Sequence, residues 1–383
     1  MNKPAGPVAA TYGREEAAMR AYCADGQARA MALGNRGPIR FTADGDLAPE
    51  IREAYSRCGF YVFEGVLKRD ELADVEADFL DIQSRLPIHR GAEVDSRGRP
   101  ALGVGRKGLN LVWGKPLSDP VGGTKAAHGR YPVKMFEPKA PQGAPDEIAY
   151  LVLGSLQFSE ACLRVYGHPE LLAVAAAING PDFTPFNEAL WMKGPGQGVS
   201  VAWHQDGWTH WDSPDLDEGS HGFNFMGQLY GCSPANGLWV VPGSHRGKAD
   251  IAAMVAAAGT ERLPEAVPLV CAPGDVAITN RQAVHGSFAN TSPDWRVTVN
   301  FGFHRRRSVE GVAGGGVHNA AAVYDAARIA ERAKVIGWAI EARRQRFPDE
   351  TPFAYAPHAG LRFVWDDSAR AALKDYNLLD LGI

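Results

Sequence analysis

Several features that would place the chain in a specialised class are missing from its 383 residues. The sequence has no uninterrupted apolar run long enough to cross a bilayer, so we expect no membrane partner. Its N-terminal segment carries charges early and lacks the compact apolar core of a secretory signal. The formal net charge is −4, and this lack of a basic excess argues against a nucleic-acid partner. The sequence does not indicate an oligomeric state.

Cysteine is also scarce. The five cysteines are odd in number and share no metal-like spacing: Cys23, Cys58, Cys162, Cys232 and Cys271. Their scatter favours reduced thiols in a cytoplasmic protein over a disulfide framework. The overall composition is ordinary for a soluble globular protein, with 45% hydrophobic and 22% charged residues.

The first half of the chain predicts helices, one strand and a long loop region. We expect an N-terminal arm over 1–45, then helix, strand and helix, with the strand near Gly59–Gly65. Residues 85–147 are rich in Gly and Pro, which predicts a loop-rich insertion and a candidate lid. Residues 148–179 predict helix that stops near Asn179-Gly180-Pro181.

Short strands punctuated by turns predict a β core over residues 186–304. The expected strands are 189–193, 199–203, 223–230, 238–241, 267–271, 276–279 and 297–304. Many short strands with regular turns favour a jelly roll. A helical extension is expected over 305–383, with Arg328, Glu331, Arg332 and Arg343 largely off its apolar face. We therefore expect one domain over 1–383, mainly β with flanking helices.

The most informative segment is Trp203-His-Gln-Asp206. On a strand, His204 and Asp206 point to the same face, so an imidazole and a carboxylate can reach one metal ion. In a chain with 11 His, the probability that one His-x-Asp pair occurs by chance is roughly one half. This pair therefore needs support from other residues. A second imidazole would complete the facial triad typical of non-haem iron(II) oxygenases.

Support comes from the segment that contains His285 and Ser287, followed by Arg296 at the start of the last strand. A guanidinium can hold a carboxylate through two parallel hydrogen bonds, which a lysine does less well. Arg296 and Ser287 could therefore bind the far carboxylate of a dicarboxylate cosubstrate whose keto-acid end chelates the metal.

These motifs together resemble the phytanoyl-CoA dioxygenase family of iron(II)- and 2-oxoglutarate-dependent oxygenases. The likeness covers about residues 45–80 and 165–305. It rests on Cys58–Leu67, Lys193-Gly-Pro, Trp203–Asp206, Asn236–His245 and His285-Gly-Ser287 with Asn290 and Arg296. The insertion at 85–147 and the tail after residue 305 have no counterpart in the resemblance.

The resemblance implies a double-stranded β-helix, which is this jelly roll in its cupin-like form. It implies iron(II) on His204, Asp206 and His285, and 2-oxoglutarate on Arg296 and Ser287. Lys193 is a further candidate for the cosubstrate site, although an exposed lysine is the commoner outcome. With O2 as the other cosubstrate, the implied reaction hydroxylates a small molecule and releases succinate and CO2. Related halogenases have a small residue in place of the carboxylate, so Asp206 disfavours halogenation. Desaturation, epoxidation and ring formation stay open.

Other residues have simpler interpretations. Gln205, Trp203 and His245 are expected to be structural, and Asn290 and Ser292 to shape a turn. The loop 208–221, with His210 and His221, could line the pocket or be a solvated turn. Arg305–Arg307 is expected to be a solvated charge run. Two rival functions also stay open: a cupin-like metalloenzyme that does not use 2-oxoglutarate, and a non-catalytic binding protein on the same barrel.

Overall fold

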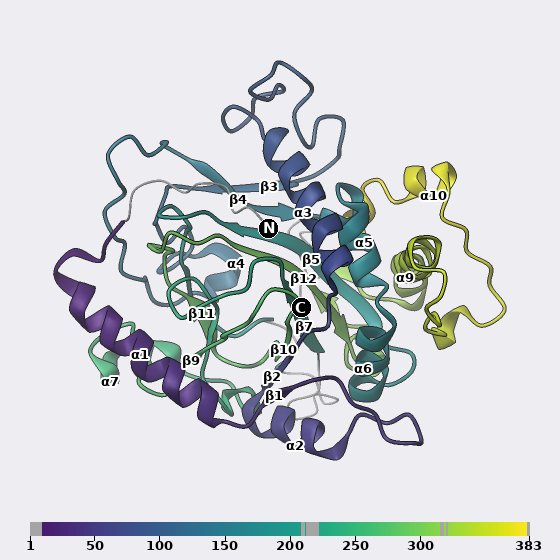
Figure 1. Cartoon of the computed structure of the whole chain (residues 1–383), viewed down its shortest axis with the longest axis horizontal. Coiled ribbons are helices and arrows are strands. Elements are labelled where there is room, and N and C mark those ends of the chain that lie inside the picture. The colour runs from purple at the N-terminus through teal and green to yellow at the C-terminus, as the bar shows by residue number, and fades with distance from the viewer. Residues whose placement is uncertain (1–9, 208–210, 212–221, 315–317, 319–320, 381–383) are drawn as a thin grey trace.

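A computed structural model describes residues 10–207, 211, 222–314, 318 and 321–380. Two antiparallel sheets form its centre, and helices cover them on opposite sides (Figure 1). Within the described ranges, no helix is long and apolar enough to cross a membrane.

The larger sheet has eight strands in the order β1-β2-β10-β7-β12-β5-β4-β3. In chain order they are β1 (Arg36–Gly37), β2 (Phe60–Phe63), β3 (Leu111–Gly114), β4 (Ile148–Leu153), β5 (Thr184–Lys193), β7 (Gly222–Gln228), β10 (Val276–Asn280) and β12 (Arg296–His304). The smaller sheet has the order β6-β11-β8-β9. Its strands are β6 (Val201–His204), β8 (Trp239–Val240), β9 (Val267–Pro268) and β11 (His285–Ser287). A separate hairpin pairs β13 (Ala313–Gly314) with β14 (Ala322–Val323).

The strands from β5 to β12 confirm the predicted jelly roll. They divide into β10-β7-β12-β5 in the larger sheet and β6-β11-β8-β9 in the smaller one, and all their pairings are antiparallel. The chain therefore crosses repeatedly between the sheets, as a jelly roll requires. This crossing brings β11 beside β6 although the two are far apart in sequence.

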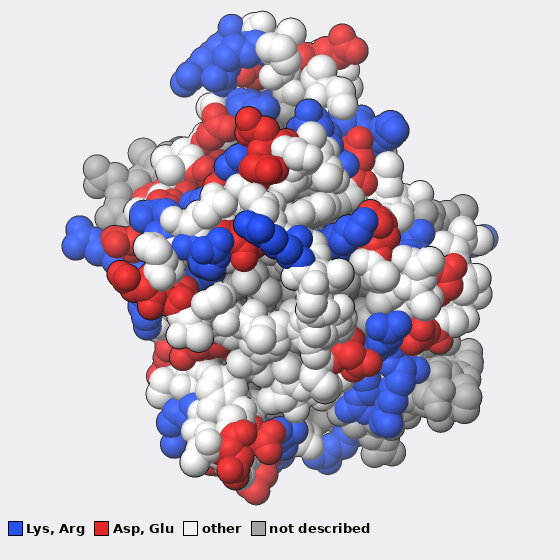
Figure 2. Space-filling model, turned by 90° about the vertical axis from the view of Figure 1, so that its right-hand side faces the viewer, with Lys and Arg blue, Asp and Glu red and all other residues white. Residues whose placement is uncertain are grey.

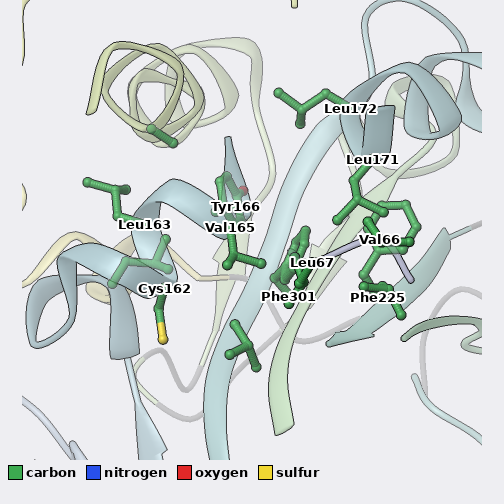
Figure 3. Close-up of a cluster of buried hydrophobic side chains, with 14 of the residues drawn as sticks. Val66, Leu67, Cys162, Leu163, Val165, Tyr166, Leu171, Leu172, Phe225 and Phe301 are labelled. Atoms are coloured by element: carbon green, nitrogen blue, oxygen red, sulfur yellow. The ribbon is translucent and has the colours of Figure 1, made fainter. Parts of the chain in front are cut away.

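Helices bury the outer face of the larger sheet. They are α2 (Pro49–Cys58), α3 (Arg69–Ser84), α5 (Glu160–Tyr166), α6 (Pro169–Asn179) and α9 (Ala326–Arg346). Figure 3 shows side chains of α5 and α6, among them Tyr166 and Leu171, near Phe225 of β7 and Phe301 of β12. All four side chains are almost fully buried. Because Phe225 and Phe301 pair across neighbouring strands, this core holds the sheet in register.

On the other side, α1 (Glu16–Ala32) lies along the smaller sheet (Figure 1). Tyr22 stacks on Trp239 of β8 with ring centroids 4.3 Å apart. Gly26 allows this approach, because a Cβ there would lie 2.5 Å from the Trp239 ring. The expected arm at 1–45 thus contains a packed helix.

Short helices occupy the connections that remain. They are α4 (Ala126–Gly129), α7 (Ile251–Ala258), α8 (Arg306–Val309) and α10 (Asp367–Ala372). In Figure 2, Lys and Arg side chains are interspersed with Asp and Glu side chains around a central uncharged area of this face.

One prediction about the elements was wrong, and another gains detail. Residues 148–153 form strand β4 and not the start of a helix, because this run pairs with β3 and β5. The insertion at 85–147 contains β3, which forms the edge of the larger sheet, and the short helix α4. The remaining expected strands agree with the structure to within a few residues, while β11 and α7 were not predicted.

The charged face assigned to the C-terminal helix was also partly wrong. Arg332 and Arg343 are buried and face acidic partners on other elements. Arg332 pairs with Glu188 at 2.6 Å, and Arg343 pairs with Glu71 at 2.6 Å. The packed face of α9 therefore carries both arginines alongside its apolar residues.

Candidate metal centre

The three predicted metal ligands meet where β6 and β11 lie side by side. His204 ends β6 and His285 begins β11, and the two residues are direct partners in the antiparallel pairing. Their rings are 4.1 Å apart between centroids. One nitrogen or oxygen atom of His204, Asp206 and His285 can be chosen so that all three lie within 4.8 Å of one another. Within the described ranges, this is the only cluster of three such side chains.

Asp206 reaches the site from a position just beyond the strand. The prediction placed His204 and Asp206 on one strand, but β6 ends at His204. A main-chain hydrogen bond from Asp206 to Arg281 holds the residue after the strand end, at 2.8 Å. Oδ1 of Asp206 then lies 3.5 Å from Nε2 of His204. This turn therefore brings the side chains of His204 and Asp206 to face each other.

Both imidazoles have one ring nitrogen in contact with a main-chain oxygen. Nδ1 of His204 lies 2.8 Å from the carbonyl of Ala202, and Nδ1 of His285 lies 2.9 Å from that of Ala283. A proton on each Nδ1 leaves Nε2 with a free lone pair for a metal ion. Burial, together with the neighbouring His204, lowers the pKa of His285 to about 4. His285 is therefore neutral near pH 7, as a metal ligand must be.

Three groups surround the carboxylate of Asp206. Asn224 Nδ2 donates to Oδ2 at 3.4 Å, and Arg281 Nε lies 3.6 Å from the same oxygen. Arg130 lies 3.2 Å from Oδ1. Burial alone would raise the pKa of Asp206, but the contact with His204 and the charge of Arg281 outweigh it and hold the pKa well below its usual value. The carboxylate therefore stays ionised.

The predicted cosubstrate residues form a second buried group. Arg296 begins β12 opposite Lys193 at the end of β5, and both are almost fully buried. Lys193 donates to Ser287 Oγ at 2.9 Å and to the carbonyl of Phe288 at 2.6 Å. Burial and the charge of Arg296 hold the pKa of Lys193 well below its usual range. The expectation of an exposed lysine was therefore wrong.

A short chain of hydrogen bonds orients the Arg296 guanidinium. Its Nε donates to Thr298 Oγ1 at 3.0 Å, and that hydroxyl donates to Gln228 at 2.9 Å. Within the described ranges, Arg296 forms no ion pair. A buried guanidinium without a carboxylate partner is costly, so this pocket is suited to an anion.

One cavity of about 530 Å³ connects these groups. It is lined by the three candidate ligands together with Ser287 and Arg296, whereas Lys193 lies behind Ser287. The remaining wall is largely apolar and aromatic and comes from the insertion and from β4 and β5. Its residues include Val112, Tyr131, Tyr150, Leu151 and Trp191. The volume is sufficient for a dicarboxylate and a small organic substrate together.

The residues present fit an iron(II) ion and 2-oxoglutarate. Two imidazoles and one ionised carboxylate on one side form the donor set of a facial triad. The unpaired cation Arg296 and the hydroxyl of Ser287 suit the far carboxylate of a keto acid in the same cavity.

The simpler interpretations of neighbouring residues are confirmed. Gln205 donates to the carbonyls of Ser244, Gly247 and Gln282 and thus has a structural role. Trp203 is fully buried, and His245 contacts the carbonyl of Ser56 at 3.0 Å.

The structure confirms the turn that was predicted before β12, but it does not describe the two histidines of the loop after β6. Asn290 donates to the carbonyls of Lys193 and Asp294, which shapes the predicted turn. His210 and His221 lie outside the described residues.

Four residues whose side chains touch the candidate ligands were not predicted, and one of them is Asn224 of β7. Arg130 and Tyr131 come from the insertion, and the Tyr131 ring lies 4.6 Å from that of His204. Arg281 comes just after β10 and is fully buried. No local sequence pattern marks Arg130 or Tyr131, while the proximity of Arg281 to His285 in sequence was the one available signal.

Comparisons with known proteins give one family match. Residues 137–298 match the family described as phytanoyl-CoA dioxygenase. No curated protein matches the sequence.

Among solved structures, AviO1 from Streptomyces viridochromogenes Tue57 is 23% identical, with 66% of this chain and 92% of that chain covered and a TM-score of 0.44. EctD from S. alaskensis, solved with 2-oxoglutarate and 5-hydroxyectoine, is 18% identical, with 70% and 80% covered and a TM-score of 0.47.

The family match covers the strand that carries His204, the turn with Asp206, the strand with His285, and Arg296. It leaves out the resembling stretch at 45–80. The structural likenesses are too low in identity and TM-score to add to it, so the assignment rests on the family match. Residues 137–298 of the chain thus match the phytanoyl-CoA dioxygenase family, whose members are iron(II)- and 2-oxoglutarate-dependent oxygenases.

Proposed function

We propose that the protein hydroxylates an unactivated C–H bond of a small molecule and converts 2-oxoglutarate and O2 to succinate and CO2. His204, Asp206 and His285 would hold the iron, and Arg296 and Ser287 would hold the cosubstrate. The observation that carries this proposal is that all five side chains line one cavity.

When bound, iron and 2-oxoglutarate would activate O2, the oxidant that removes hydrogen from carbon. The chain would bind the iron and the cosubstrate, orient them, and exclude water from the reacting groups. Each imidazole is tied through Nδ1, so neither ring can turn its Nε2 away. Asp206 stays ionised beside the charge of Arg281, and Asn224 donates a hydrogen bond to the same carboxylate oxygen. The apolar wall excludes water from the reacting carbon.

Lys193 takes a supporting role in this proposal. Its amino group ends on Ser287 and on the carbonyl of Phe288, so it holds the Ser287 hydroxyl at the cavity. Lys193 would thus position the cosubstrate through Ser287.

The direct test couples two measurements. The iron-loaded protein should form succinate from 2-oxoglutarate with matching O2 uptake when candidate small molecules are supplied. A metalloenzyme that does not use the keto acid would form no succinate with any substrate it converts. A non-catalytic protein would bind neither iron(II) nor 2-oxoglutarate.

The Arg296→Ala substitution is expected to raise the KM for 2-oxoglutarate by about 10- to 100-fold, with a smaller change in kcat. This range corresponds to the loss of a charge-assisted hydrogen bond to the cosubstrate. Steady-state kinetics with varied 2-oxoglutarate measures it, and Arg246→Ala is the control, because Arg246 is exposed. An unchanged KM would remove Arg296 from the site.

We also infer that the protein works in the cytoplasm and without nucleic acid. All five cysteines are free thiols, and a reducing compartment keeps both thiols and iron(II) in this state. The net charge of −4 and the mixed charges in Figure 2 offer no broad basic surface on that face. Fractionation of cells that express the tagged chain tests the location.

A further inference from the structure

Arg130 extends from the insertion to the candidate metal centre. It directly follows α4, and its Nη1 lies 3.2 Å from Oδ1 of Asp206. Nη2 lies 3.3 Å from the hydroxyl of Tyr131, and Nε is buried without a hydrogen-bond partner among the described residues. The guanidinium is therefore buried against the site with only part of its hydrogen-bonding capacity used.

Asp206 does not require Arg130 for its orientation. Asn224 and Arg281 already contact Oδ2. Arg281 cannot turn away, because its guanidinium lies 3.5 Å from the centre of the Phe186 ring and its side chain is 1% exposed. Arg130 contacts the other oxygen, the one that faces Nε2 of His204.

That oxygen lies on the side where the ligand atoms converge. A divalent cation held by the triad would face the positive charge of Arg130 across a poorly solvated space, and the two charges repel. An anion placed between them would remove the repulsion. Arg130 is thus suited to bind an anion that arrives with the substrate.

The position of Arg130 between two cavities supports this role. Arg130 lines the cavity of about 530 Å³ that holds the triad, and also a neighbouring cavity of about 660 Å³. Lys248 and Gln205 line the second cavity as well. A ligand that enters through either cavity therefore meets the Arg130 guanidinium.

Acidic groups near Arg130 are few or already engaged. Glu188 lines the triad cavity, but it pairs with Arg332 at 2.6 Å. Asp250 lines the other cavity and caps α7 through a hydrogen bond to Ala253. Asp206 alone pairs with Arg130 within the described ranges, and it already pairs with Arg281. The described part of the site thus carries an excess of positive charge.

We propose that Arg130 is a specificity-determining residue that binds a carboxylate or phosphate group of the substrate. This inference rests on the proposed function. The substrate is then a small amphiphile whose anionic group contacts Arg130 and whose apolar body packs on the wall that includes Trp191 and Leu151. The guanidinium exchanges its contact with Asp206 for one with the substrate.

The test uses the full chain loaded with iron(II) and 2-oxoglutarate without oxygen, and follows the visible charge-transfer absorption of the complex. The probes are two matched pairs: hexanoate with hexanamide, and hexyl phosphate with hexanol. In the wild type, at least one anionic probe should perturb the absorption at about 10- to 100-fold lower concentration than its neutral partner. The pair that responds distinguishes carboxylate from phosphate.

Arg130→Ala should remove this preference, and Arg130→Lys should restore part of it. Arg97→Ala is the matched control, since Arg97 is an exposed arginine of the same insertion. The affinity for 2-oxoglutarate should stay the same in all three variants. The proposal is overturned if neither anion is preferred by the wild type, if Arg130→Ala keeps the preference, or if it weakens 2-oxoglutarate binding. Absence of the absorption in the wild type would instead overturn the proposed function.

Discussion

Replacing His204 by alanine should lower iron(II) affinity and succinate formation by more than about 100-fold. The imidazole is one of the three proposed ligands, and its loss would leave only Asp206 and His285. The fold should remain, because the main-chain contact of the His204 ring lies within its own strand, at Ala202. Metal content after anaerobic loading, succinate release and circular dichroism measure the three effects.

His89→Ala is the matched control for this substitution. His89 is exposed, and the contact of its ring is with the carbonyl of the neighbouring Arg90. Its removal should leave iron content and succinate formation at the wild-type level. Full turnover by the His204→Ala protein would show that the metal ligands have been assigned wrongly.

Replacing Arg332 by methionine should lower the free energy of unfolding by about 3–5 kcal/mol. Arg332 and Glu188 are each 1% exposed, and the guanidinium also stacks on Tyr376. Without the arginine, the Glu188 carboxylate is left buried with the hydroxyl of Tyr376 as its partner. The free energy of unfolding, measured in urea by circular dichroism, tests the prediction.

Arg344→Met separates the effect of burial from a general loss of charge on α9. Arg344 lies on the same helix and pairs with Glu341, but its side chain is 53% exposed. This variant should unfold at nearly the wild-type urea concentration. Equal destabilisation by the two substitutions would argue against a special role for the buried pair.

The strands of the jelly roll were largely predictable because their signals are local. Alternation and turn residues mark the strands and connections between residues 184 and 304. The segment Ile148–Leu153 was misread for a related reason. Its run of apolar residues has no alternation, and periodicity cannot distinguish a buried strand from a buried helix. Only its pairing with β3 and β5 decides that it is a strand.

Charged residues were harder to place than apolar ones. Lys193 was expected at the surface, since lysines are mostly exposed, and Arg332 and Arg343 were expected off the apolar face of their helix. All three are buried, because their partners come from distant parts of the chain. Lys193 meets Ser287, and Arg332 meets Glu188. No local pattern predicts these encounters.

The sequence by itself determined which residues are candidates for the metal and the cosubstrate. His204, Asp206, His285, Ser287 and Arg296 lie in short motifs of residue types suited to that chemistry, and the fold brings them to one cavity. Only the tertiary structure decided that Arg130 and Arg281 flank Asp206 and that an apolar wall faces the triad. These features depend on the pairing of strands and loops far apart in the chain, which no local pattern records.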